Sequence, residues 1–270
     1  MLFNKFFKRP SNWLSVGLVI FLIILALGGS VFSPHDPLTV NTDVRFLPPG
    51  VQYWMGTDNL GRDVASRVIS GTRLALQSTV VILSSASLIG ILVGLISGYY
   101  GGLVDETFMR ISDVFIAFPG LVLALAIAAA LGPNLTNAMI AISVVWWPSY
   151  ARLIRGQVLS VKQRDFINAT RSLGAGDFYI MFKHILPNIL IPFLVQVTSD
   201  IGPALVTTSS LSFIGMGAQP PTPEWGSMVS SGRMYILDYW WISTFPGAAI
   251  FITVLVFNNF GESLRKLLQK

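Results

Sequence analysis

The residues in this chain whose types could do chemistry are few and far apart. There are two histidines, His35 and His184, and no cysteine among the 270 residues. The lack of cysteine excludes disulfides and thiolate sites, and two distant histidines are too little material for a multi-histidine metal site. The phosphate-binding pattern G-x-x-x-x-G-K-[ST] does not occur, and no acid pair or nucleophile–base set stands out. We therefore expect no catalytic residue and no metal site in this chain.

One acidic residue stands out because it lies inside an apolar stretch. Asp200 falls within residues 189–214, where an aspartate costs about 2.5–3.5 kcal/mol on membrane-insertion scales. With Gln196 and Thr198 it could form the wall of a pathway and attract an ammonium group or another cation. The small hydroxyl residues nearby could equally pack between helices. Trp147 is a packing or interface aromatic in the simpler interpretation and part of a gate in the other.

The composition indicates lipid as the solvent. Hydrophobic residues make up 53% of the chain and charged residues only 11%, whereas an ordinary soluble domain carries roughly 25% charged residues. The net charge of +5 could suggest nucleic acid. The basic residues are not clustered, however, and lie between long apolar stretches, where orientation in a membrane explains them better.

Six apolar stretches are long enough to cross a bilayer, which takes about 20 residues. The first follows a basic start, as a signal peptide would, but it is too long for one and has no clean cleavage site after it. Proline and glycine interrupt the third at Pro119-Gly120, which a membrane helix tolerates when neighbours satisfy the freed backbone groups. The predicted spans are residues 13–32, 74–99, 114–131, 137–153, 189–214 and 239–260.

The lysines and arginines predict the orientation of these spans. With the N-terminus inside, thirteen of the 18 basic residues lie in inner segments, which favours both termini in the cytoplasm. We therefore predict a cytoplasmic N-terminus (residues 1–12) followed by a single transmembrane domain (residues 13–270). That domain contains two external loops, 33–73 and 217–238, and a cytoplasmic loop, 155–188.

The cytoplasmic loop is the most informative segment. From Asp165 the pattern predicts a short helix, a break at residues 174–176 and a second, amphipathic helix before Leu186-Pro187. Apolar residues on such a loop need a partner, either a groove in another protein or the lipid headgroups. The residues alone leave both open. These apolar residues are Phe178, Ile180, Met181 and Phe182.

The spacing in this loop resembles the EAA loop of ABC importer permeases, which reads E-A-A, three residues, Gly, nine residues, I-x-L-P. Here Asn168-Ala169-Thr170 stands at E-A-A, Gly174 at the glycine and Leu186-Pro187 at the end, with His184 at the isoleucine. In that family the loop is a coupling helix that docks on the ATPase subunit. The resemblance implies coupling roles for Asn168, Ala169, Thr170, Gly174, Ala175, Phe178, Leu186 and Pro187. Asn168 in place of glutamate removes the motif's acid.

Two further stretches are similar to signatures of the C-type permease subunit of dipeptide, oligopeptide and nickel importers. Residues 56–67 read GTDNLGRDVASR, and residues 211–226 read LSFIGMGAQPPTPEWG. The charges in the first could form an ion network that makes the outer loop rigid, or lie on a solvated surface. The family implies that an extracytoplasmic binding protein docks on this face. The candidate docking residues are Asp58, Arg62, Asp63, Pro221 and Trp225.

The resemblance implies an all-α integral membrane protein with six transmembrane helices and the MetI-like, type I ABC importer permease fold. Such a subunit would lie in the bacterial or archaeal cytoplasmic membrane and pair with a second permease subunit as a heterodimer. Two ATP-binding subunits would carry ATP and Mg²⁺, and no cofactor would bind to this chain. Di- or oligopeptides are the expected cargo, with nickel or a metal chelate as the alternative. A stand-alone channel or secondary transporter has the same span count but no reason for the docking loop.

Overall fold

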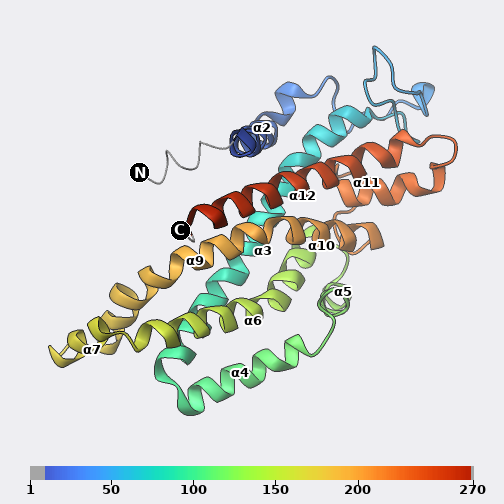
Figure 1. Cartoon of the computed structure of the whole chain (residues 1–270). Helices are drawn as coiled ribbons and strands as arrows, with labels where there is room; N and C mark the ends of the chain where they lie inside the picture. The colour runs from blue at the N-terminus through green and yellow to red at the C-terminus, as the bar shows by residue number, and fades with distance from the viewer. Residues whose placement is uncertain (1–9, 269–270) are drawn as a thin grey trace.

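The computed structural model describes residues 10–268, and these residues form an elongated helical molecule (Figure 1). The described part of the chain contains no β-strand beyond a single bridge between Thr57 and Asp63. The long helices are α2 (Pro10–Phe32), α3 (Val64–Tyr100), α4 (Gly102–Ile116), α5 (Gly120–Leu131), α6 (Leu135–Lys162), α9 (Leu186–Ser199), α10 (Ile201–Ile214) and α12 (Trp241–Leu268). The short ones are η1 (Thr42–Val44), α7 (Asp165–Ser172), α8 (Asp177–Tyr179), η2 (Ile180–Ile185), α11 (Trp225–Gly232) and η3 (Arg233–Tyr235).

The centre of the molecule is the pair α3 and α6, which run side by side in the same direction. Glycines at four-residue spacing on α3, namely Gly90, Gly94 and Gly98, meet α6 where Tyr150 and Ile154 lie. Without side chains, these glycines let the two backbones approach closely, which is how helices associate in a membrane. The cluster around this contact also takes in buried residues of α9, η2 and α10. The predicted spans did not identify this glycine stripe.

Several predicted spans are longer, bent or broken in the structure. The third is divided because α4 and α5 meet at an angle of 89° across residues 117–119. The fifth ends at Ser199 and resumes at Ile201, so Asp200 lies in a break between α9 and α10. By length and composition, three described helices could cross a membrane, or four if α4 and α5 form one bent span. The remaining apolar stretches include the shorter helices Ser15–Gly29 and Ile201–Ile214.

The loops are shorter than predicted or contain short helices. Residues 33–63 are largely irregular, as expected, apart from the short helix η1, and the last part of the predicted loop 33–73 is helical because α3 begins at Val64. The loop 155–188 is shorter than predicted because α6 continues to Lys162, and the loop 217–238 contains α11 and η3. Of the predicted N-terminal segment 1–12, residues 1–9 lie outside the described residues.

The two functional loops lie at opposite ends of the molecule. Residues 163–186, which we call the elbow, include α7 at one tip, whereas residues 33–63 and 215–240, which we call the loop end, lie at the other (Figure 1). The elbow ends in a single π-helical turn, η2, in which the N–H of Leu186 donates to the carbonyl of Met181. Pro187 lacks an N–H, and its ring would clash with the carbonyl four residues earlier. The widened turn before it relieves that conflict.

The glycine stripe should tolerate no added carbon. A Cβ on Gly94 would lie 2.7 Å from Cβ of Ile154 and against the carbonyl of Ala151, and overpacking of this kind costs about 1–3 kcal/mol. Gly94→Ala should therefore lower the thermal unfolding temperature of the protein in detergent. Gly156→Ala on exposed α6 surface is the control, since a Cβ there meets nothing within 4 Å. Equal unfolding temperatures for the two variants would contradict the close approach of α3 and α6.

Candidate functional site

The elbow turns at Gly174, as its sequence predicts. Gly174 has φ of +84°, a left-handed conformation that glycine adopts without strain. Its N–H donates to the carbonyl of Arg171 at 2.9 Å and closes the end of α7. The next glycine, Gly176, precedes α8 in an extended conformation with φ of −72°. The two glycines that the pattern singles out therefore have different roles, and only Gly174 requires the absence of a side chain for its backbone angles.

The elbow has one face packed on the chain and one face exposed. Ile180 and Met181 are buried against α3, α6 and α9, so the expectation that they lie exposed on this loop is wrong. They belong to the core because the π-helical turn points them toward the bundle. The outer face carries Leu173, which is 88% exposed, and Phe178, which is 71% exposed. Phe166, Tyr179 and Phe182 are also exposed there.

The predicted coupling residues divide between these two faces. Asn168, Ala169 and Phe178 are exposed, and Phe178 packs on the ring of Phe182 with 4.4 Å between ring centroids. Thr170 Oγ1 donates to the carbonyl of Phe166 at 2.7 Å, within its own helix. The remaining residues shape the elbow: Gly174 makes the turn, Ala175 and Leu186 pack against the core, and Pro187 begins α9. Sequence reasoning missed Leu173, Phe166 and Tyr179, although their apolar character beside the glycine break was visible.

Asp200 lies in the break between α9 and α10 with two polar partners. Its carboxylate accepts a hydrogen bond from the hydroxyl of Tyr150 on α6 at 2.9 Å. It also accepts from the side-chain amide of Gln196, at 3.0 and 3.2 Å. Asp200 is half-buried and Gln196 is exposed. The structure thus brings together an acid, an amide and a phenol at a point where a membrane helix is interrupted.

The side chains of the other two pathway candidates contact residues other than Asp200. Thr198 Oγ1 donates to the carbonyl of Leu194 in its own helix at 2.7 Å. Thr198 also lines a cavity of 740 Å³, mainly apolar, between α2, α3 and α9. Trp147 is buried and packs edge-on against Phe115 of α4, with 5.7 Å between ring centroids. Tyr150, one turn further along α6, is the aromatic residue that contacts the acid.

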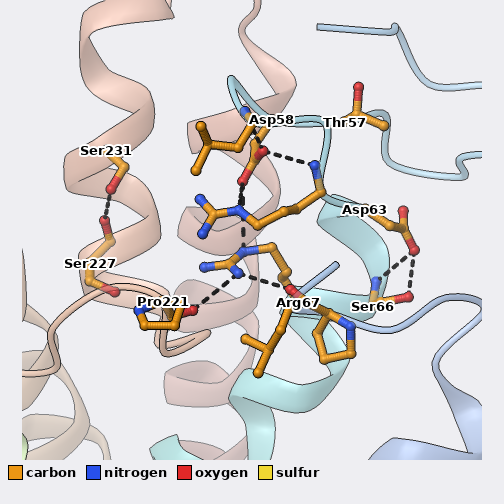
Figure 2. A network of polar contacts seen from close by, with 12 residues as sticks. Thr57, Asp58, Asp63, Ser66, Arg67, Pro221, Ser227 and Ser231 are labelled. Carbon is orange, nitrogen blue, oxygen red and sulfur yellow. Dashed lines mark hydrogen bonds and ion pairs between the residues drawn. The ribbon is translucent and has the colours of Figure 1, made fainter. Parts of the chain in front are cut away.

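At the loop end, Asp58 holds two arginines. Its carboxylate accepts from Nε of Arg62 at 2.7 Å and lies 3.9 Å from Nε of Arg67. Asp63 accepts from the N–H groups of Ala65 and Ser66 and so caps α3. Figure 2 shows Asp58 directed toward the arginines and Asp63 toward Ser66. The predicted ion network is confirmed for Asp58 and Arg62, whereas Asp63 acts mainly as a helix cap.

The same contacts correct the prediction of docking residues. Asp58, Arg62, Asp63 and Trp225 are all buried, so their side chains are not available to a docking protein. The indole N–H of Trp225 donates to the carbonyl of Val68 at 2.9 Å. Of the predicted set only Pro221 is exposed, and its carbonyl accepts from Arg67 at 3.2 Å (Figure 2). The two signature stretches, far apart in the sequence, thus pack on the start of α3 and hold one another in place.

Glu224 is a buried acid that the sequence reasoning missed. Its carboxylate accepts from the N–H groups of Gly226 at 3.0 Å and Ser227 at 2.8 Å and caps α11. Burial raises the pKa of the Glu224 carboxyl, and these hydrogen bonds oppose the rise. An acidic residue directly before a predicted helix is a known cap signal, so the residue could have been found.

The loop end also carries exposed apolar side chains. Leu237 is 94% exposed, and Val51, Trp54 and Met234 are also exposed. Stacking of Phe46 on Tyr239, with 4.2 Å between ring centroids, joins the two loops that carry these residues. We call Val51, Trp54, Met234 and Leu237 the loop-end apolar surface.

The fold is similar to that of chains in solved ABC transporter structures. A chain in the structure of the MetNI methionine ABC transporter, in inward-facing conformations, superposes with a TM-score of 0.59 at 21% identity and covers 74% of this chain and 95% of that one. A chain of an amino acid ABC transporter solved with histidines superposes with a TM-score of 0.53 at 20% identity over 75% of this chain and 91% of that one. These likenesses show the MetI-like ABC transporter fold.

Sequence comparison identifies the family. Residues 90–270 match the family described as binding-protein-dependent transport system inner membrane component. Residues 1–49 match the N-terminal TM domain of oligopeptide transport permease C. The chain belongs to the binding-protein-dependent transport system inner membrane component family, and it is an ABC transporter permease subunit with several membrane helices.

Curated relatives match along nearly the whole chain. The probable D,D-dipeptide transport system permease protein DdpC of Escherichia coli (strain K12) is 46% identical over 251 residues, which is 92% of this chain and 84% of DdpC. The dipeptide transport system permease protein DppC of Alkalihalophilus pseudofirmus is 41% identical over 94% of this chain and 84% of its own length. The glutathione transport system permease protein GsiD of Pectobacterium atrosepticum is 40% identical over 98% of this chain and 89% of GsiD.

Removing Asp58 should loosen the loop end. Asp58→Ala leaves Arg62 and Arg67 buried without their carboxylate, and breaking a buried pair costs about 3–5 kcal/mol. The variant should become sensitive to limited proteolysis within residues 33–63. Asp43→Ala is the control, because the Asp43 side chain is exposed and makes no hydrogen bond among the described residues. An unchanged cleavage pattern for Asp58→Ala would show that the ion network does not stabilise this loop.

Proposed function

We propose that this chain forms half of the translocation pathway of a peptide importer, together with a homologous second permease subunit. Three relatives named for dipeptide and glutathione transport support a peptide cargo over nickel. The proposal assigns no catalytic residue to this chain. ATP and Mg²⁺ would bind to two separate ATP-binding subunits, and the cargo would arrive on an extracytoplasmic binding protein.

The exposed apolar face of the elbow is the observation that carries the proposal. Leu173, Phe178, Tyr179 and Phe182 project from a short helical segment beyond the packed bundle. A small apolar helix of this kind fits a groove in another protein. The core residues of the elbow, such as Ile180 and Ile185, join it to α3, α6 and α9. Movement of a docked ATPase subunit would therefore reach the membrane helices through a packed contact.

The distribution of basic residues supports an orientation with the elbow and both termini in the cytoplasm. Thirteen of the 18 lysines and arginines then lie on the inner side, several of them in or beside the elbow. The loop end would face the outside of the bacterial or archaeal inner membrane. In this orientation the ATPase subunits and the binding protein contact opposite ends of the chain.

The break at Asp200 is the proposed contact point with the cargo. An acid inside a membrane span faces a partner or a water-filled space. Here Tyr150 and Gln196 provide hydrogen bonds to the carboxylate, but neither neutralises its charge. A peptide ammonium group offers both a charge and N–H donors to such a carboxylate. We propose that Asp200 and Gln196 line the pathway, with Thr198 and Trp147 further from the cargo.

The loop-end apolar surface takes the docking role first assigned to buried residues. Its four side chains are exposed on loops that the Asp58 cluster and the Phe46–Tyr239 stack hold in place. Apolar residues exposed on a well-supported loop are typical of interaction sites. We propose that the binding protein contacts this surface when it delivers cargo.

A side chain at Gly174 should weaken the docking of the ATPase subunits. Gly174→Val places a β-branched residue at φ of +84°, where no neighbour lies within 4 Å of a Cβ, so the strain comes from the backbone alone. The left-handed conformation costs a non-glycine residue about 1–2 kcal/mol. If the elbow must keep this turn to dock, that cost lowers the affinity for the ATPase subunits about tenfold. Binding and uptake in proteoliposomes measure the effect. Gly176→Val is the matched control, since its φ of −72° suits any residue. Normal uptake by Gly174→Val would argue against the docking role of the elbow.

Charges at the two ends of the chain should have separable effects. Leu237→Glu should weaken the binding protein's affinity for the assembled importer and leave the ATPase subunits bound, because a charge opposes burial in an apolar contact. Leu173→Glu should weaken the binding of the ATPase subunits and leave the affinity for the binding protein unchanged. Each variant is the control for the other. Surface plasmon resonance measures the affinity of each variant for the binding protein and for the ATPase subunits. A loss of the same partner in both variants would refute the assignment of the two ends.

A further inference from the structure

Tyr99 occupies an unusual position at the end of α3. Its side chain is only 3% exposed, yet its hydroxyl donates to the carboxylate of Asp177 in the elbow at 2.6 Å. Arg171 of the elbow approaches the same hydroxyl, with 3.5 Å from Nη2 to the phenolic oxygen. Lys162 and Arg171 also lie over the ring, at 5.3 and 6.0 Å from its centroid. One buried ring therefore contacts two cations and one acid.

These contacts join the end of α3 to the end of α6 and to the elbow that follows it. Asp177 and Arg171 belong to the elbow, Lys162 is the last residue of α6, and Tyr99 lies one residue before the end of α3. The ammonium group of Lys162 also donates to the backbone carbonyl of Tyr99. The apolar contacts of the elbow, by contrast, are non-directional, because the hydrophobic effect depends on area and not on angle. The polar contacts of Tyr99 are what fix the register of the elbow against α3.

The chain that follows Tyr99 is built to turn. Gly101 and Gly102 have φ of +68° and +55°, and a Cβ on either would meet nothing within 4 Å. Helix α4 begins there, and Ser112 is the single buried residue on it within the described part of the chain. Two ion pairs fasten α4 to α6, Asp105 with Arg155 at 2.5 Å and Asp113 with Arg152. Helix α4 is therefore a lightly packed arm that starts at a two-glycine turn and is held by charges.

We propose that Tyr99 is a positioning residue that passes displacement of the elbow to the Gly101–Gly102 turn, and through it to α4. The inference rests on the proposed function of the elbow as the docking site of an ATPase subunit. The Tyr99 hydroxyl has this role, because its hydrogen bond to Asp177 is directional and links the elbow to the last turn of α3. When Asp177 and Arg171 move, their contacts with the Tyr99 hydroxyl displace the end of α3, which lies immediately before the Gly101–Gly102 turn and α4. Without the hydroxyl, the elbow can shift against its apolar contacts while α4 stays in place.

The test uses the assembled importer in proteoliposomes with binding protein and a dipeptide cargo. Tyr99→Phe keeps the ring and its cation contacts and removes the hydroxyl. The ATPase subunits should bind with unchanged affinity and hydrolyse ATP, while cargo uptake per ATP falls about tenfold, as the loss of one charge-assisted hydrogen bond permits. Tyr100→Phe is the matched control, since Tyr100 is 53% exposed and its hydroxyl makes no hydrogen bond among residues 10–268. It should leave uptake per ATP unchanged.

A second variant keeps the test decisive if Tyr99→Phe is unstable. Asp177→Ala removes the acceptor from the exposed elbow and should reduce uptake per ATP to the same extent. The double variant should be no worse than either single one, because both remove the same interaction. Normal uptake per ATP in Tyr99→Phe, or additive losses in the double variant, would overturn the inference. A loss of ATPase binding in Tyr99→Phe would also overturn it, because Tyr99 would then only shape the docking surface.

Separate results would contradict the docking of ATPase subunits at the elbow and the role of Tyr99. If Gly174→Val lowers ATPase binding and uptake while Tyr99→Phe does not alter uptake per ATP, the elbow docks but Tyr99 does not transmit its movement. If the unmodified chain does not bind ATPase subunits at all, the proposed function itself is wrong.

Discussion

The close approach of α3 and α6 is the constraint on which the rest of the structure depends. Three glycines at four-residue spacing allow it, because a side chain at any of them would overlap α6. Association of helices in lipid gains nothing from expelling water, so packing at short range must stabilise it. Helix α3 then carries the ion cluster of the loop end at its start and Tyr99 at its end, and α6 carries the partner of Asp200 and the two arginines that hold α4. Both ends of the molecule are thus positioned by one helix pair.

Four acids, Asp58, Asp63, Asp200 and Glu224, lie where the regular helices stop. The acid in the α9–α10 break has a phenol and an amide as partners, and the buried acids of the loop end cap α3 and α11 or pair with arginine. Each arrangement follows from the cost of burying a charge without partners. Exposed apolar side chains lie along the membrane helices and also outside them, at the elbow tip and on the loop-end apolar surface. The packed interior therefore holds the loops in place, and the outermost side chains remain free to meet partners.

The errors of the sequence prediction have one physical origin. Asp58, Arg62, Asp63 and Trp225 were predicted to dock a partner because charged and aromatic residues on a loop suggest a surface. The structure buries them, since two distant loops fold over one another and satisfy each other's polar groups. Ile180 and Met181 show the same error, because their burial depends on the π-helical turn that Pro187 imposes. Burial is a property of pairs of segments, and no single segment reveals it.

The membrane setting, the helical class, the turn at Gly174, the irregular loop before Val64 and the family resemblance could all be predicted from the sequence. These follow from local composition, from the conformational freedom of glycine and from spacing within one segment. Only the tertiary structure decided that Asp200 meets Tyr150, that Tyr99 meets Asp177 and that the two loop-end motifs lock together. Those contacts join residues separated by 50 to 154 positions. They depend on how rigid helices pack against one another, which the order of residues along one helix does not specify.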